Sequence, residues 1–158
     1  MLDLILSIIK PVCQSEPLVD ETTSPKAIKV AANDLLPVMG NLHKNPALYF
    51  DMLSCVTGVD NGVQSGTMEV VYNLYSIPFD HNLMVKVILP RDNAEVDSVS
   101  EIWKTANWQE REIFDMYGVH FRNHPDLRRI LMPADWQGHP LRKDYNHQEY
   151  YRDIKVAY

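Results

Sequence analysis

Cysteine is scarce in this sequence, and its scarcity limits the chemistry that the chain can support. Cys13 and Cys55 are the only two cysteines, and they form no C-x-x-C pattern. Because iron–sulfur clusters and structural zinc sites rely on clustered thiolates, we expect neither to be built by this chain alone. Two reduced, buried thiols of a cytoplasmic protein are the favoured interpretation, and a disulfide between them is the open alternative.

The sequence also lacks an excess of basic residues, and it has no long apolar run. The sequence has 15 Lys+Arg against 21 Asp+Glu, a net charge of -6, whereas nucleic-acid binding needs a basic surface to neutralise phosphates. We therefore expect no nucleic-acid partner. The apolar run Leu4–Ile9 is too short to span a bilayer and lacks the flanks of a signal peptide, so it predicts a short amphipathic helix. Any membrane association is expected to come through another protein.

The hydrophobic pattern that is present predicts an ordered set of strands and helices. The runs 67–78 and 82–90 alternate strongly, and the short stretch between them predicts an antiparallel hairpin. Asn33 is expected to cap a helix that Asn45-Pro46 ends. Further strands are predicted over 27–31 and 49–60, helices over 33–44, 95–107 and 107–118, and core positions at Leu83, Val85, Val87 and Leu89.

This order of elements predicts an α+β fold. Residues 1–117 are expected to form a two-layer domain with a mixed, largely antiparallel sheet and helices on one face. From Gly118 onward the sequence is rich in proline, glycine, aromatic and charged residues and has no sustained period. We therefore predict that residues 118–158 form an extended, partner-docking segment that crosses a surface.

The stretch 107–133 carries the densest charge, and local helix rules account for part of it. Asn107 is expected to cap the helix, with Glu110 three residues later completing a capping box. Gly118 is placed to end the helix in a left-handed conformation. Arg111 and Asp115, four residues apart, are expected to form an ion pair. An apolar stripe is predicted from Ile113, Met116 and Tyr117.

A catalytic site is the competing interpretation of these charges. Glu112 and Asp115 share a helix face and could act as acid and base, or bind a hard cation. The nearby histidines, however, form no H-E-x-x-H pattern, and the sequence has no nucleophile elbow, phosphate loop or dinucleotide fingerprint. A free-standing metal-assisted hydrolase is therefore the disfavoured hypothesis, and it would use Glu110, Glu112, Asp115 and His124.

The same stretch resembles the signature of a known family. The run EREIFDMYGVHFRNHPDLRRILMP, followed by DWQGHPLRKDY, is similar to the C subunit of NADH-quinone oxidoreductase, which belongs to the peripheral arm of respiratory complex I and is related to the plastid and cyanobacterial J subunit. The segment YFDMLSCVTGVD extends the resemblance over most of the chain. Matching positions are Glu110, Arg111, Glu112, Asp115, Met116, Tyr117, His124, Arg128, Ile130, Leu131, Gly138, Pro140, Leu141, Arg142, Asp144 and Tyr145.

The resemblance implies a non-catalytic subunit of a proton-translocating enzyme. No catalytic, cofactor or metal site is implied for this chain, because NADH, FMN, iron–sulfur clusters and quinone belong to other subunits of the complex. The implied partners are the D, B and I subunits of complex I, on the cytoplasmic face of the bacterial inner membrane. The implied fold is a two-layer α+β domain whose extended segment lies on the D subunit, which carries the quinone site.

A permanent interface of this kind can use arginine forks and rigid aromatic side chains. The signature and the expected subunit interface comprise Glu110, Arg111, Glu112, Asp115, Tyr117, His124, Arg128, Arg129, Trp136, Arg142, Asp144 and Tyr145. The same module could instead serve a membrane-bound energy-converting nickel–iron hydrogenase, or a relative that depends on coenzyme F420 or ferredoxin. The sequence of this one chain distinguishes these machines poorly, and it does not identify the quinone, the electron donor or the pumped ion.

Overall fold

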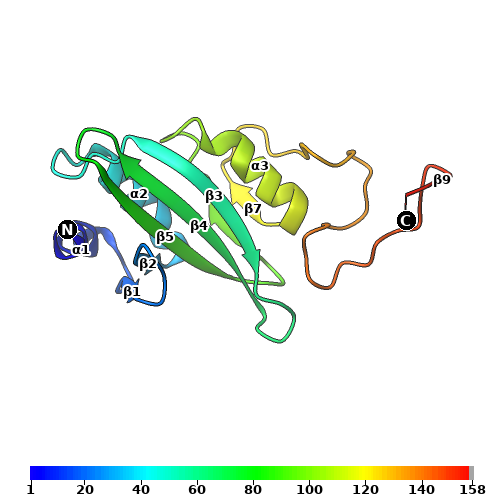
Figure 1. The fold of residues 1–158 in the computed structure, drawn as a ribbon, viewed down its shortest axis with the longest axis horizontal. Coiled ribbons are helices and arrows are strands. Elements are labelled where there is room, and N and C mark those ends of the chain that lie inside the picture. Colours follow the sequence, from blue (N-terminus) through cyan, green and yellow to red (C-terminus); the bar gives the residue numbers. More distant parts are fainter. Residues whose placement is uncertain (157–158) are drawn as a thin grey trace.

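The centre of the protein is a five-stranded sheet with the strand order β1-β2-β5-β4-β3 (Figure 1). The structure is a computed structural model that describes residues 1–156, so residues 157–158 of the expected docking segment lie outside the described part. β2 and β5 are parallel, and the other neighbouring pairs are antiparallel. The sheet is therefore mixed and largely antiparallel, as predicted. Its strands are β1 (Leu18–Asp20), β2 (Ala27–Val30), β3 (Met52–Asp60), β4 (Thr67–Ser76) and β5 (His81–Pro90).

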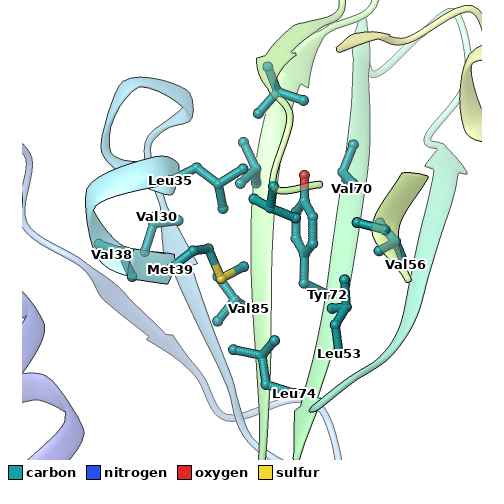
Figure 2. Packing of buried hydrophobic residues seen from close by; sticks show 14 of the residues in the cluster. Val30, Leu35, Val38, Met39, Leu53, Val56, Val70, Tyr72, Leu74 and Val85 are labelled. Atoms are coloured by element: carbon teal, nitrogen blue, oxygen red, sulfur yellow. The ribbon is translucent and has the colours of Figure 1, made fainter. Parts of the chain in front are cut away.

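Three helices accompany this sheet in the described residues. They are α1 (Leu2–Ile9), α2 (Leu35–Lys44) and α3 (Ala106–Tyr117), with short 3-10 turns η1 (Lys10–Val12) and η2 (Ala32–Asp34). Side chains from all three helices and from one face of the sheet belong to a single buried cluster. Figure 2 shows Leu35 and Met39 of α2 beside Tyr72 and Val85 of the sheet. The predicted α+β arrangement, with an N-terminal helix, is confirmed.

The hairpin of β4 and β5 supplies the middle of the core. Leu83, Val85, Val87 and Leu89 are each at most 3% exposed, as the alternation in the sequence predicted. Their neighbours Met84, Lys86 and Ile88 lie on the opposite face of the sheet and are only half-buried or exposed. The alternating pattern was reliable here because one face of the strand is buried and the other is not.

The helix predicted over 95–107 is wrong. The chain instead forms strand β6 (Glu95–Asp97), which pairs in parallel with β7 (His120–Arg122), followed by turns up to the start of α3. Trp103 is buried in these turns, and its indole N–H donates to the Phe50 carbonyl at 3.1 Å. The backbone N–H of Val99 is bound by the buried Glu110 carboxylate at 2.8 Å. Long-range partners therefore replace the hydrogen bonds that a helix would have made.

Two smaller expectations near the N-terminus also need correction. Asn33 does not cap α2, because residues 32–34 form η2 and Asp34 precedes the helix. The Asp34 carboxylate accepts hydrogen bonds from the backbone N–H groups of Gln14 and Ser15. The polar, proline-bearing stretch 14–27 was expected to form a loop, but strand β1 forms within it because its backbone pairs with β2.

The C-terminal part of the chain begins inside the core and then leaves it. Val119 and Phe121 are each 1% exposed. Beyond β7 the chain is irregular until a small hairpin, β8 (Tyr150–Tyr151) and β9 (Ile154–Lys155). In Figure 1 this yellow-to-red segment passes α3 and continues away from the sheet. The absence of sustained periodicity after Gly118 thus corresponds to an extended course in the described residues.

The two cysteines differ in their exposure. Both cysteines are free, with Cys13 half-buried and Cys55 exposed. The expectation of burial is wrong for Cys55, because Val56 beside it occupies the inward position of β3.

No helix within residues 1–156 combines the length and the apolar character that crossing a membrane requires.

Candidate functional site

Most of the signature residues converge on α3 and on the chain that follows it. Gly118 ends α3 in the left-handed conformation with a φ of 77°, and its N–H donates to the Phe114 carbonyl, as predicted. A Cβ at Gly118 would lie 2.6 Å from the His139 ring, so only glycine allows this close approach. The chain therefore turns back at Gly118 and lays residues 127–145 against α3. We call the contacts that hold this segment the C-terminal anchor.

Asp115 is the central residue of the anchor. Its buried carboxylate accepts the consecutive backbone N–H groups of Ile130, Leu131 and Met132 at 2.8–3.1 Å. It also accepts the Arg129 guanidinium at 2.7 Å. Burial alone would raise the pKa of Asp115, but the Met132 N–H, Arg129 and the two other N–H groups hold its pKa below the ordinary value. Asp115 therefore binds its own chain as an anion.

The predicted pair of Arg111 with Asp115 is wrong, because Arg129 occupies the carboxylate. Arg111 donates instead to the carbonyls of Arg128 and Arg129 at 3.1 and 3.3 Å. Arg129 in turn donates to the carbonyls of Trp136 and Gly138 at 3.1 and 2.9 Å. Two arginines of the signature thus satisfy backbone oxygens of an irregular segment, whose backbone lies outside any sheet or helix that could do so.

The predicted capping box is also wrong. α3 begins at Ala106, and no side-chain hydrogen bond caps it. The Glu110 side chain is fully buried, and it accepts hydrogen bonds from the Ser98 hydroxyl at 2.5 Å and the Val99 N–H at 2.8 Å. Burial raises the pKa of Glu110 to about 7, against the lowering effect of these two donors. Glu110 ties the turn before α3 to the helix itself.

His124 makes a second buried tie beside Glu110. The distance between His124 Nε2 and Glu110 Oε2 is 3.8 Å, and both side chains are fully buried. His124 Nε2 lies 3.0 Å from the Asn107 carbonyl, while Nδ1 accepts the Asp126 N–H at 3.0 Å. This pattern fits a neutral imidazole that donates from Nε2. His124 therefore fixes the entry of the C-terminal segment to the start of α3.

Asp144 anchors the far end of the segment to the sheet. It pairs with Arg91, which is 6% exposed and also binds Asp60 through two hydrogen bonds of 2.8 and 3.0 Å. The Arg91 guanidinium holds the pKa of Asp60 well below its usual range. Asp60 also accepts the Lys143 N–H at 2.8 Å, and Arg142 donates to the Tyr117 carbonyl at 2.7 Å.

Asp60 and Arg91 were not predicted to belong to the site. Asp60 ends β3 just before a turn, where an aspartate is expected for local reasons, and Arg91 directly follows β5. The two strands lie on either side of β4. The only signal in the sequence was that each of two apolar runs is closed by a charged residue, Asp60 in one case and Arg91 in the other. Their proximity follows from the strand order, which local patterns do not determine.

The aromatic residues of the segment contact one another. The Trp136 indole N–H donates to the Tyr145 hydroxyl at 3.0 Å, and the Trp136 ring lies 5.2 Å from that of Tyr151. Asp135 accepts hydrogen bonds from the Tyr151 hydroxyl and the Arg152 guanidinium. The end of the segment is therefore a small cluster with its own contacts.

The side chains of Arg128 and Glu112 take no part in the anchor contacts described above. Arg128 has a side chain that is 73% exposed, and its ionic partner is the exposed Asp126 at 3.0 Å. Glu112 is exposed on α3, whereas Asp115 is buried, so these carboxylates do not face one substrate. Within residues 1–156, no group of three or more His, Cys, Asp or Glu side chains could hold a metal ion. The residues proposed for a hydrolase are thus held apart or already engaged.

Comparison with known sequences identifies relatives of this chain. The family of the respiratory-chain NADH dehydrogenase 30 kDa subunit matches residues 28–151. The NADH-quinone oxidoreductase C subunit of Chloroherpeton thalassium is 49% identical over 118 residues, which cover 74% of this chain and 48% of that protein. The same subunit of Geobacter metallireducens is 46% identical over 128 residues, covering 80% of this chain and 78% of that protein. The aligned region thus spans about half the length of the first relative.

Two solved structures share the architecture. A trypsin-resistant fragment of Nqo5 has a TM-score of 0.65 at 24% identity, covering 80% of this chain and 98% of the fragment. A chain of the membrane-bound sulfane sulfur reductase, an archaeal respiratory membrane complex, has a TM-score of 0.72 at 21% identity. It covers 92% of this chain and 85% of its own. At such low identities these similarities establish the fold alone.

The matched sequence defines a class, the subunits of respiratory-chain enzymes. Within that class, the chain belongs to the 30 kDa subunit family of respiratory-chain NADH dehydrogenase, which is the family of the NADH-quinone oxidoreductase C subunit. The resemblance inferred from the signature is therefore confirmed. The match over residues 28–151 includes α3 and most of the C-terminal segment.

Proposed function

We propose that this chain is a structural, non-catalytic subunit in the peripheral arm of a proton-translocating NADH:quinone oxidoreductase. The observation that carries the proposal is the identity of 46–49% with the C subunit of two bacteria over 118–128 residues. The family match over residues 28–151 includes most of the sheet, α3 and the signature, so it does not depend on one motif alone. The complex would carry out electron transfer from NADH to quinone with FMN and iron–sulfur clusters in other subunits.

The docking part of the proposal concerns residues 118–158 and the quinone-site D subunit. Large apolar side chains stay exposed along the described part of this segment: Leu131, Leu141, Tyr150 and Ile154 are 51–67% exposed. The anchor holds the backbone of the same segment in one course against α3. A preorganised segment with exposed apolar side chains loses little further entropy when it binds, which favours a stable interface. The B and I subunits would be its other neighbours.

Affinity purification of the tagged chain from membranes tests this proposal. The chain should bring down the D, B and I subunits together with the flavin-containing part of the complex. Recovery of the chain alone, or with a nickel-site protein in place of the flavin and NADH subunits, would contradict the assignment. The second result would favour an equivalent role in a related membrane complex, and the fold shared with a chain of an archaeal respiratory complex supports that alternative.

A peripheral position at the cytoplasmic face of the inner membrane follows from the same proposal. The chain would then reach the membrane only through its partners. Washing membranes with alkaline carbonate or chaotrope should release it together with the arm, without detergent. Retention of the chain after the other arm subunits have been washed away would point to a separate membrane contact.

A further inference from the structure

A groove lies between α3 and the segment that the anchor holds against it. It has a volume of about 510 Å³, and it is lined by Arg111, Phe114, Leu127, Arg128, Arg129, Ile130, Met132 and Ala134. The floor is apolar, since Phe114, Leu127, Ile130 and Met132 contribute half-buried side chains. Among the described residues, three arginines and no carboxylate line its walls. The groove therefore combines an apolar floor with a positive edge.

The walls of this groove are fixed by contacts already described. Asp115 accepts hydrogen bonds from the backbone N–H groups of Ile130 and Met132, and Arg111 donates one to the carbonyl of Arg128. These bonds link one wall, α3, to the other, the segment 127–134. A ligand would not have to order the groove in order to bind there, which lowers the cost of binding.

The charge at the groove is opposite to that of the whole chain. Arg129 is neutralised by Asp115 at 2.7 Å, whereas the 73% exposed guanidinium of Arg128 has the exposed Asp126 as its ionic partner within residues 1–156. Arg111 donates to uncharged carbonyls and keeps its full positive charge. A net positive edge on a chain of net charge -6 selects an acidic ligand.

Large exposed side chains flank the groove. Leu131 is 61% exposed between the lining residues Ile130 and Met132. Trp108 is 70% exposed on α3, three residues before Arg111 and thus on the same helix face. Exposed tryptophan, arginine and leucine around a preformed hollow are typical of a protein interface, in which tryptophan and arginine carry much of the binding energy.

We infer that this groove receives a segment of a neighbouring subunit in which an apolar side chain lies beside an aspartate or glutamate. The apolar side chain fills the floor, and the carboxylate takes the exposed Arg128 guanidinium as a bidentate partner. The inference rests on the proposed function, since it requires an assembled complex. It locates part of the docking surface at α3 and residues 127–134, and it states the chemistry of the partner that this part accepts.

The decisive experiment compares three variants in the complex purified from membranes through a tag on this chain. Arg128→Glu should lower the yield of intact complex on the order of tenfold at moderate salt, because it places a negative charge opposite the partner carboxylate. Arg128→Lys should keep most of the yield, since it retains the charge and loses only the planar fork. Lys104→Glu is the matched control, because Lys104 is 78% exposed, forms a similar surface pair and does not line the groove.

A photoreactive amino acid in place of Leu131 then identifies the occupant in the same complex. Mass spectrometry should find the cross-link on another subunit, within a few residues of an acidic side chain. Cross-links to lipid, to a basic segment or to a second copy of this chain would overturn the inference, as would equal yields for Arg128→Glu and Lys104→Glu.

Thermal melting of the isolated Arg128→Glu chain must match that of the wild type, so that a folding defect is not mistaken for lost docking. Failure of the wild-type chain to bring down any complex would instead overturn the proposed function itself.

Discussion

At the scale of single residues, Glu110 shows how burial changes the role of a side chain. Its position in the sequence suggested an exposed capping carboxylate, but the side chain is fully buried between Ser98, Val99 and His124. Burial raises its pKa to about 7. The folded chain therefore keeps a proton on Glu110 at pH values where the unfolded chain, with an ordinary pKa of 4.5, has lost it. By linkage, the contribution of Glu110 to stability falls as pH rises through this window.

Glu110→Gln should remove this pH dependence, because glutamine resembles the protonated acid. The free energy of unfolding of the wild type, relative to the variant, should fall by roughly 2 to 3 kcal/mol between about pH 5 and about pH 8. Urea unfolding of both chains across this range measures the difference. Parallel pH profiles for the two chains would show that Glu110 does not titrate between the folded and unfolded states in this range.

At the scale of elements, predictions were confirmed where the contacting residues are close together along the chain, and they were wrong where the actual partner is distant in sequence. The β4–β5 hairpin joins neighbouring residues through a short turn, and its alternation was enough to place Leu83 and Val85 in the core. Residues 95–97 instead pair with β7, more than twenty residues later in the chain. A helical pattern in their sequence could not reveal that partner. The end of α3 at Gly118 was predictable because its cause, a left-handed glycine, is local.

Gly118→Ala should destabilise the chain more than the conformational penalty alone predicts. A left-handed alanine costs about 1 kcal/mol or slightly more, and its Cβ would also lie 2.6 Å from the His139 ring. We expect a total loss of roughly 3 kcal/mol, since the overlap adds packing strain. Gly66→Ala is the matched control, because Gly66 also has a positive φ, of 64°, but nothing within 4 Å of the added Cβ. Urea unfolding should separate the two variants, and equal losses would mean that His139 moves aside without cost.

At the scale of the whole molecule, the C-terminal segment depends on the domain that it leaves. Side chains of that domain and of the segment itself bind several of its backbone polar groups, with Asp115, Arg111 and Asp60 as examples. The signature thus has an internal role that the sequence alone did not indicate, since most of its arginines bind backbone carbonyls of this chain. Among the signature arginines, Arg128 is the one whose side chain stays mostly exposed.

Arg91→Ala should release the far end of the segment while the sheet stays folded. Arg91 bridges Asp60 and Asp144 across the edge of the domain, so its loss leaves the buried Asp60 without its cation. Trypsin should then cleave after Arg142 and Lys143 several-fold faster than in the wild type, because local opening exposes the segment. Lys104→Ala serves as the control, since Lys104 forms an exposed surface pair. Cleavage at unchanged rates would place the main restraint elsewhere, at Asp115 and Arg142.

The sequence by itself determined the α+β class, the central hairpin, the end of α3 and the family, because each depends on local spacing or on a contiguous motif. The tertiary structure alone decided which charges meet. Asp115 binds Arg129 rather than Arg111, Glu110 is buried beside His124, and Arg91 joins Asp60 to Asp144. These outcomes depend on strand order and on the return of the chain after Gly118. A charged side chain binds whichever partner the fold brings within reach, and separation along the chain does not reveal that partner.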